Sequence, residues 1–273
     1  MKKFITTICC IALALACCFS TTACGKGKKS DLEYVKNKGT LIVGITDYEP
    51  MDYKEEGSNE WIGFDADMAK LFAQRLGVKV EFVEITWSQK TIEIASKSID
   101  LIWNGMTISE DLKSEIDFSV AYATNMQVAV IKKSNQDAIN SVATVKASSI
   151  AVEEGSAGDE VATDTIQAST IHKVESQVQA LLEVKAGTSQ VAIVDYTMAY
   201  SIVGNGNYTD LMIVDTTAVS FNQELFGVGA RKGSDMVKEL NAFFKEQYAN
   251  GKMAQLATQY VSVALNDAGL AAL

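Results

Sequence analysis

Short apolar runs alternate with amphipathic segments along most of this 273-residue chain. The apolar run at residues 41–45 precedes a segment, residues 65–76, whose apolar side chains recur at helical spacing. Further strands are expected at residues 78–83, 99–103, 149–152 and 191–194. Further helices are expected at residues 31–37, 88–97, 157–164, 175–186, 235–248 and 251–260. Such alternation is typical of open parallel α/β sheets, so the chain is expected to be an α/β protein.

The alternation falls into two units, one before and one after about residue 130. Extended stretches at residues 122–131 and 220–231 separate these units. If the C-terminal helices complete the first unit, the chain crosses between lobes twice, and two crossover strands form a hinge beside a cleft. The carboxyl ends of the strands would point into that cleft, where ligands of such sheets bind. The expected organisation is a first lobe of residues 39–125 with 226–273, and a second lobe of residues 126–225.

All five cysteines lie within the first 24 residues. A basic start, an apolar run at residues 4–19 and small residues lead to Cys24, which is typical of a bacterial lipoprotein signal. We therefore expect residues 1–23 to be a signal peptide, Cys24 to carry lipid, and residues 24–38 to form the anchor and tether. An ordinary secretory peptide with incidental cysteines is the alternative. A lipid anchor would hold the chain at the extracellular face of the membrane, as in a Gram-positive cell.

Charge and composition exclude several classes of function. The formal net charge of −10 argues against nucleic acid or an anionic membrane surface as the main partner. A single histidine, His172, makes a histidine-rich metal site or a Ser-His-Asp triad hard to build, and we expect no metal or cofactor. We expect His172 to be structural or on the surface. The acidic cluster Asp159, Glu160 and Asp164 is expected to be a solvated helix face.

Three ordered stretches carry a specific family resemblance. They are GTLIVG at 39–44 with DYEPM at 47–51, WIGFDADMAK at 61–70 with RLGVKVEF at 75–82, and DLIWNGMT at 100–107 with IDFS at 116–119. Weaker matches follow at 152–158, 177–187, 194–195 and 226–233. Together these stretches resemble the bacterial extracellular solute-binding proteins of family 3, the polar amino-acid receptors of ABC importers.

The resemblance implies a two-lobed periplasmic-binding-protein-like fold of type II, with a hinge of two crossover strands. It implies a receptor, not an enzyme, that captures a small amine-bearing solute, an amino acid or a derivative. Closure of the hinge would present this ligand to a membrane ABC permease, and the receptor is expected to act as a monomer. A dehydratase-like enzyme of the same fold and a ligand-sensing surface receptor are the alternatives.

The resemblance also assigns polar ligand contacts. Asp195 matches the acid that receives the ligand's ammonium, although a helix N-cap is the alternative role. Thr107 matches a side-chain and backbone contact, while Asn104 and Gly105 match positions that line the cleft. Ser156 and Ala157 match the start of a helix whose free N–H groups meet the ligand carboxylate, with simple capping as the alternative for Ser156. Glu224 is a weaker candidate that would reach the cleft from the second crossover.

Aromatic side chains are candidates for the walls of the cleft. Tyr48 matches an aromatic that covers the ligand, and Trp87 and Trp103 are further candidates because ring faces attract ammonium groups. Core packing is the alternative for each ring. Asp47 is a possible second acid near the ammonium, with turn capping as its alternative.

One position departs from the family pattern. Five residues after the threonine, where the family usually places an arginine that grips the ligand carboxylate, this chain has Leu112. The loss of such a charge-assisted pair removes about 1.5–3 kcal/mol. Two hypotheses follow: the ligand is an amine that lacks a free α-carboxylate, or the carboxylate is held by N–H groups near Ser156 and by Thr107, or by a basic residue elsewhere.

Overall fold

The structure is a computed structural model that describes residues 30–273. The predicted signal peptide and the lipidation of Cys24 lie outside the described residues and stay predictions. The helices are α2 (Asp31–Lys38), α3 (Phe64–Leu76), η1 (Trp87–Gln89), α4 (Lys90–Ser96), α5 (Glu110–Glu115), η2 (Lys133–Asn135), α6 (Val142–Lys146), α7 (Ala157–Glu160), η3 (Val161–Thr165), α8 (Gln177–Ala186), α9 (Tyr196–Ile202), η4 (Gly206–Tyr208), α10 (Met236–Ala249), α11 (Lys252–Gln259) and α12 (Asp267–Ala271). Within the described part of the chain, none of these helices has the length and apolar character needed to span a bilayer.

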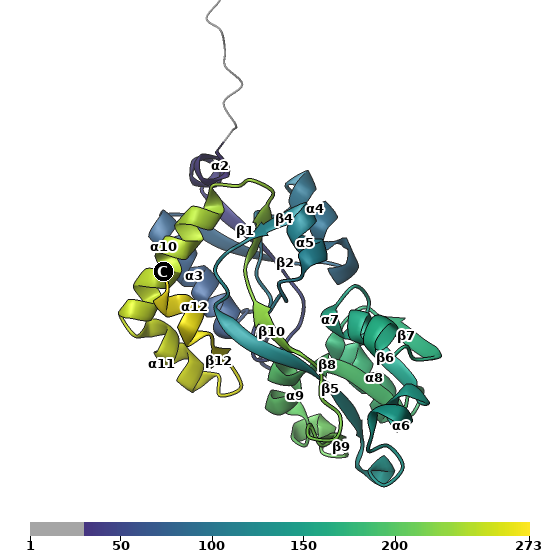
Figure 1. The fold of residues 1–273 in the computed structure, drawn as a ribbon. Coiled ribbons are helices and arrows are strands. Elements are labelled where there is room, and N and C mark those ends of the chain that lie inside the picture. Colours follow the sequence, from purple (N-terminus) through teal and green to yellow (C-terminus); the bar gives the residue numbers. More distant parts are fainter. Residues whose placement is uncertain (1–29) are drawn as a thin grey trace, which may run out of the picture. The chain divides into compact units, whose positions relative to one another are not determined.

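The first sheet has the strand order β2-β1-β3-β11-β4 (Figure 1). Its strands are β1 (Thr40–Ile45), β2 (Lys79–Glu84), β3 (Leu101–Ile102), β4 (Ile116–Phe118) and β11 (Gly229–Arg231). Strand β1 is parallel to β2 and β3, as the alternation of strands and helices predicts. Strand β11 comes from the far end of the sequence and pairs antiparallel with both β3 and β4.

The second sheet has the strand order β10-β5-β8-β6-β7, and two further strands also pair with β5. Its strands are β5 (Ala123–Lys132), β6 (Ser149–Glu153), β7 (Thr170–Val174), β8 (Val191–Asp195), β9 (Leu211–Ile213), β10 (Gln223–Phe226) and β12 (Ala264–Leu265). Strand β6 is parallel to β7 and β8, whereas β5 is antiparallel to β8. The carboxyl ends of β6 and β8 therefore meet at one edge of this sheet.

Both sheets are mixed: each contains the predicted parallel strands together with antiparallel ones. Strands β5 and β10 lie side by side, with Gln223 opposite Met126 and Phe226 opposite Ala123 (Figure 1). The predicted lobe boundaries, 125/126 and 225/226, fall within this pair of strands, and the exact bounds of the lobes stay a prediction.

Helix α3 shows how local sequence builds the core. Met68, Ala69 and Phe72 are fully buried on its apolar face, and burial of one such large side chain contributes about 1.5–3 kcal/mol. Gly77 ends the helix in the left-handed conformation, with φ of 73°, a conformation that glycine adopts without steric cost. The predicted helix at 65–76 and its inward face are therefore confirmed.

Helix α8 corrects one predicted core residue. The sequence pattern places Val178, Leu181 and Leu182 inward, but Leu182 is 45% exposed. Ala180, Leu181 and Val184 are buried instead. Residues three and four positions apart share a helix face, as Leu181 and Ala180 do with Val184, and Leu182 is rotated away from that face.

Candidate functional site

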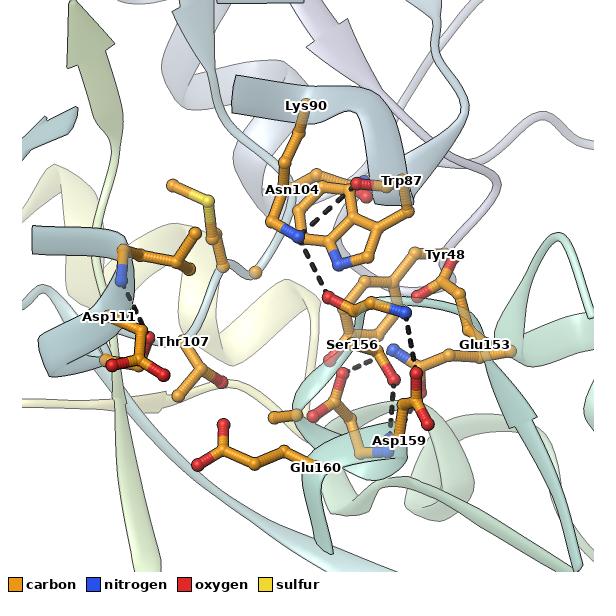
Figure 2. A pocket seen from close by; sticks show the side chains of 18 of the residues that line it. Tyr48, Trp87, Lys90, Asn104, Thr107, Asp111, Glu153, Ser156, Asp159 and Glu160 are labelled. Carbon is orange, nitrogen blue, oxygen red and sulfur yellow. Dashed lines mark hydrogen bonds between the residues drawn. The ribbon is translucent and has the colours of Figure 1, made fainter. Parts of the chain in front are cut away.

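A cleft of about 350 Å³ is lined by residues that precede β5 and by residues that follow it in the chain (Figure 2). Its volume lies at the lower end of the range of small-molecule sites. Eight of the ten predicted ligand-binding residues line this cleft: Tyr48, Trp87, Asn104, Gly105, Thr107, Ser156, Ala157 and Asp195. Asp47 and Trp103 are not among the lining residues.

Asp195 stands at the carboxyl end of β8 and is 5% exposed. Its carboxylate accepts hydrogen bonds from the side-chain amides of Asn125, Gln127 (2.6 Å) and Gln177. Burial raises the pKa of Asp195, and these amide donors oppose that rise. The hydroxyl of Tyr48 is a further hydrogen-bond partner that lowers this pKa. Asp195 is thus a buried acid that side-chain donors from several elements surround at the wall of the cleft.

Asp195 occupies the N-cap position of a helix, but its side chain does not cap that helix. Asp195 precedes α9, but its side chain accepts no hydrogen bond from that helix. Asn125 does so instead, since its Oδ1 accepts from the N–H (3.3 Å) and the hydroxyl (3.1 Å) of Thr197. The Asp195 carboxylate is thereby left facing the cleft.

Glu224, on β10, lies next to Asp195. Its Oε2 accepts from Thr107 Oγ1 at 2.9 Å, from Gln127 Nε2 at 3.0 Å and from Asn125 Nδ2 at 3.1 Å. Burial first, and then the charge of Asp195, raise the pKa of Glu224 to about 7. The crossover strands β5 and β10 thus place Glu224 and the amide donors Asn125 and Gln127 beside Asp195 of β8.

Two charged residues that the sequence did not single out, Lys90 and Glu153, also line the cleft. The buried amine of Lys90 donates to the carbonyl of Trp87 (3.3 Å) and to that of Gly155 (2.9 Å), across the cleft (Figure 2). Burial lowers the pKa of Lys90 to about 8 and raises the pKa of Glu153 to about 8. The signal for Glu153 was its place at the end of a buried strand, where such sheets bind ligands.

The turn after β6 forms a helix start of the predicted kind. Ser156 caps α7 by accepting from the N–H of Asp159 at 3.2 Å. Asp159 in turn accepts from the N–H of Gly155 at 3.0 Å and pairs with Lys173 at 2.9 Å. The predicted solvated acidic face is therefore wrong for Asp159, which is 7% exposed, while Glu160 and Asp164 are exposed.

Two buried acids accept hydrogen bonds from the loop that follows β3. The side-chain amide of Asn104 donates to Asp52 at 2.8 Å, and the N–H of Gly105 donates to Asp65 at 2.7 Å. Burial raises the pKa of Asp65 to about 7. A Cβ on Gly105 would lie 2.6 Å from the Tyr48 ring, so glycine allows this loop to pack closely against the ring. The side chain of Asn104 is thus held within the protein by Asp52 and Thr46.

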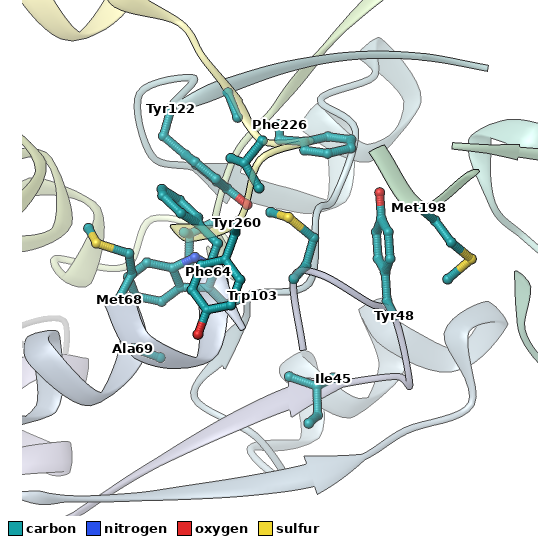
Figure 3. Close-up of a cluster of buried hydrophobic side chains, with 14 of the residues drawn as sticks. Ile45, Tyr48, Phe64, Met68, Ala69, Trp103, Tyr122, Met198, Phe226 and Tyr260 are labelled. Carbon is teal, nitrogen blue, oxygen red and sulfur yellow. The ribbon is translucent and has the colours of Figure 1, made fainter. Parts of the chain in front are cut away.

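Trp103 and Asp47 need correction. Trp103 is fully buried in a cluster of hydrophobic side chains (Figure 3). Its ring contacts those of Phe72, Phe243 and Phe244. Its neighbour in sequence, Asn104, lines the cleft because successive residues of an extended segment point to opposite sides. Asp47 is exposed, outside the cleft lining.

Leu112 lines the cleft as an apolar side chain and packs against the hydrophobic cluster that contains Trp87.

His172 is exposed, and its Nδ1 shares a hydrogen bond of 2.9 Å with the hydroxyl of Ser189, which is the structural role we expected. Among residues 30–273, no group of three or more His, Cys, Asp or Glu side chains is arranged to hold a metal ion.

The sequence of the chain matches a known protein family. The sequence profile of the bacterial extracellular solute-binding proteins, family 3, matches residues 41–263. The L-cystine-binding protein TcyJ of Escherichia coli (strain K12) is 26% identical and covers 84% of this chain and 85% of its own length.

Two solved structures show the same architecture. The P235GK mutant of ArgBP from T. maritima is 27% identical, with a TM-score of 0.78, over 85% of this chain and 99% of that one. The ancestral amino acid-binding protein AncCDT-1, a precursor of cyclohexadienyl dehydratase, is 30% identical, with a TM-score of 0.77, over the same shares. The predicted two-lobed type II fold is confirmed by these structures, and the profile match covers most of the chain. The chain therefore belongs to the bacterial extracellular solute-binding proteins, family 3.

Proposed function

We propose that this chain is the substrate-binding receptor of an ABC importer and that it captures a small amine-bearing solute, an amino acid or a derivative. The observation that carries the proposal is the arrangement around Asp195: a buried carboxylate, held by three side-chain amides, that lines a cleft of small-molecule size. Its relatives include proteins named for binding cystine and arginine. An ammonium group is the natural partner of such a carboxylate.

Aromatic groups support an amine as the ligand. Tyr48 and Trp87 line the same cleft as Asp195, and ring faces attract ammonium groups. The ligand would bind one lobe of an open form, and contacts with the other lobe would favour the closed form. It shifts this equilibrium only by its greater affinity for the closed state.

A thermal-shift screen of the purified chain tests the proposal. The panel contains the twenty amino acids, their amides and esters, small peptides and amines, with neutral sugars as negative controls. A ligand that binds only the native state raises the melting temperature. The proposal predicts a rise with at least one amine-bearing solute and none with sugars. A rise in melting temperature with sugars and none with any amine-bearing solute would overturn it.

An enzyme of the same fold is the second candidate function. The raised pKa values of Glu153 and Glu224 suit general acids, and the likeness to a dehydratase precursor favours this alternative. Incubation of the chain with each solute that it binds, followed by mass spectrometry, distinguishes the two functions. A receptor returns its ligand unchanged, whereas an enzyme converts it.

We also propose that Cys24 carries the lipid and that the chain acts as a monomer at the extracellular face of a Gram-positive membrane. The order of basic start, apolar run, small residues and cysteine supports this proposal. Incorporation of labelled fatty acid, lost in the Cys24→Ala variant, is the expected result. Equal labelling of the variant would show that another residue is the attachment point.

A further inference from the structure

Glu153 occupies a position equivalent to that of Asp195. Glu153 ends β6 and Asp195 ends β8, and these strands are parallel neighbours. Both carboxyl groups therefore lie at the same edge of the sheet, and both line the cleft. The charge of Asp195 also raises the pKa of Glu153.

One oxygen of Glu153 has no donor. The residue is 3% exposed, and its Oε1 lacks a hydrogen-bond partner within the described residues. An unsatisfied buried acceptor costs about 1–3 kcal/mol, and more when it is charged. Such a group requires an explanation, and a ligand that donates to it is one. Lys90 acts on Glu153 electrostatically, but the amine of Lys90 donates to the carbonyls of Trp87 and Gly155 instead.

The charges that line the cleft favour cations. Six carboxyl groups and two amines line it: Asp111, Glu153, Asp159, Glu160, Asp164 and Asp195, with Lys90 and Lys173. Lys173 is paired with Asp159 at 2.9 Å. An excess of one sign of charge in a cleft concentrates ligands of the opposite sign.

Some of the donors that a ligand carboxylate would use are already engaged. The N–H of Gly155 donates to Asp159, and Leu112 presents only carbon to the cleft. Among the described residues that line the cleft, both amines have protein partners. Of these two amines, Lys173 is paired with an acid, whereas the partners of Lys90 are neutral carbonyls. A ligand carboxylate would thus face six carboxyl groups with the charge of Lys90 alone to offset them.

We propose that the ligand carries two cationic groups and no carboxylate, as a diamine or a guanidino-amine does, and that Glu153 binds the second cation while Asp195 binds the first. This inference rests on the proposed capture of an amine-bearing solute. It adds the charge class of the ligand and names the residue that selects it.

Isothermal titration calorimetry with matched amines tests the charge class. Cadaverine and L-lysine differ only in the carboxylate, and cadaverine and pentylamine differ only in the second amine. Agmatine and L-arginine repeat the first comparison with a guanidinium group. We expect each dication to bind at least tenfold more tightly than its carboxylated or monocationic counterpart.

Variants of Glu153 test the assigned residue. In Glu153→Gln, the affinity for cadaverine should fall to that for pentylamine, while pentylamine binding stays unchanged. Glu153→Asp, which keeps the charge, should retain part of the preference for cadaverine. Glu175→Gln, which changes an exposed acid outside the cleft lining, is the matched control and should bind as the wild type does. The melting temperature of each unliganded variant confirms that it is folded.

The outcomes separate this inference from the proposed function. Tighter binding of L-lysine than of cadaverine would overturn the inference and leave an amine receptor standing. A cadaverine preference that survives in Glu153→Gln would overturn the role of Glu153. Absence of binding by any amine, in the calorimeter and in the thermal screen, would overturn both.

Discussion

The two faces of the cleft differ in chemistry. The first face, formed by residues that precede β5, consists of Tyr48, Trp87, Lys90, Asn104, Gly105, Met106, Thr107, Ser109, Asp111 and Leu112. The second face, formed by residues that follow β5, contains the buried acids Glu153, Asp159 and Asp195. The first face therefore supplies mainly shape and apolar contact, and the second supplies charge. In the proposed closure of the lobes, a ligand would contact both faces, so selection by shape and by charge would occur together.

The largest effect is expected from removing the central charge of the second face. Asp195→Asn keeps the volume of the side chain but leaves the ligand ammonium without its counter-charge. Loss of one partner of a buried charge pair costs about 2–5 kcal/mol, so affinity should fall by about 100-fold or more. Calorimetry with the best ligand of the thermal screen measures this loss. Asp137→Asn, at an exposed position outside the cleft lining, is the control. A loss below tenfold would mean that Asp195 is not the ammonium site.

The pH dependence of binding sharpens the role of Glu153. Burial and the charge of Asp195 raise its pKa to about 8, and Lys90 opposes that rise. These charges come from β8 and α4, while Lys173 of β7 is paired with Asp159 of α7. Below this pKa, a cation must displace the proton, so affinity should fall about tenfold for each pH unit. The measurement is calorimetry with agmatine at pH 6.5, 7.5 and 8.5. The same slope in Glu153→Gln would contradict the assignment.

A change on the first face should affect all ligands alike. Trp87→Leu removes an aromatic wall that lines the cleft and is 7% exposed. Aromatic contacts contribute about 0.5–1.5 kcal/mol beyond area, so affinities should fall about three- to tenfold. Calorimetry with cadaverine and pentylamine measures both losses. A loss that differs between the two amines would mean that the first face also selects charge.

The smallest effect concerns stability without ligand. The folded-state pKa values are about 8 for Glu153 and about 7 for Glu224, against about 4.3 in an unfolded chain. Between these values the folded protein binds more protons than the unfolded chain, so its stability falls as pH rises. From pH 5 to 7.5 the melting temperature should fall by at least about 2 °C, and less in Glu153→Gln. A melting temperature that rises over this range in the wild type would contradict the burial of these acids.

Much of the fold was predictable because the signals are local. The periodicity of α3 and the glycine after it predicted the element and its end, as the structure has them. The antiparallel strands β5, β10 and β11 were not predictable in this way, because an apolar run carries no information about strand direction. Leu182 shows a further limit: a short helix with many apolar residues does not identify its buried face.

The candidate site was predictable where the family pattern applies and less so elsewhere. Residues matched by position, such as Thr107 and Ser156, line the cleft. Trp103 was misplaced because alternation along an extended segment decides between cleft and core. Glu153 and Lys90 were missed because their significance comes from burial and from unpaired or cross-cleft contacts, which only the folded chain creates.

The most direct measurement is a crystal structure of the chain with the amine that gives the largest rise in melting temperature. We predict a ligand nitrogen within about 3 Å of a carboxylate oxygen of Asp195, and a second cationic nitrogen at Glu153 Oε1. A ligand held outside the cleft, or one whose nitrogen contacts neither carboxylate, would contradict the account.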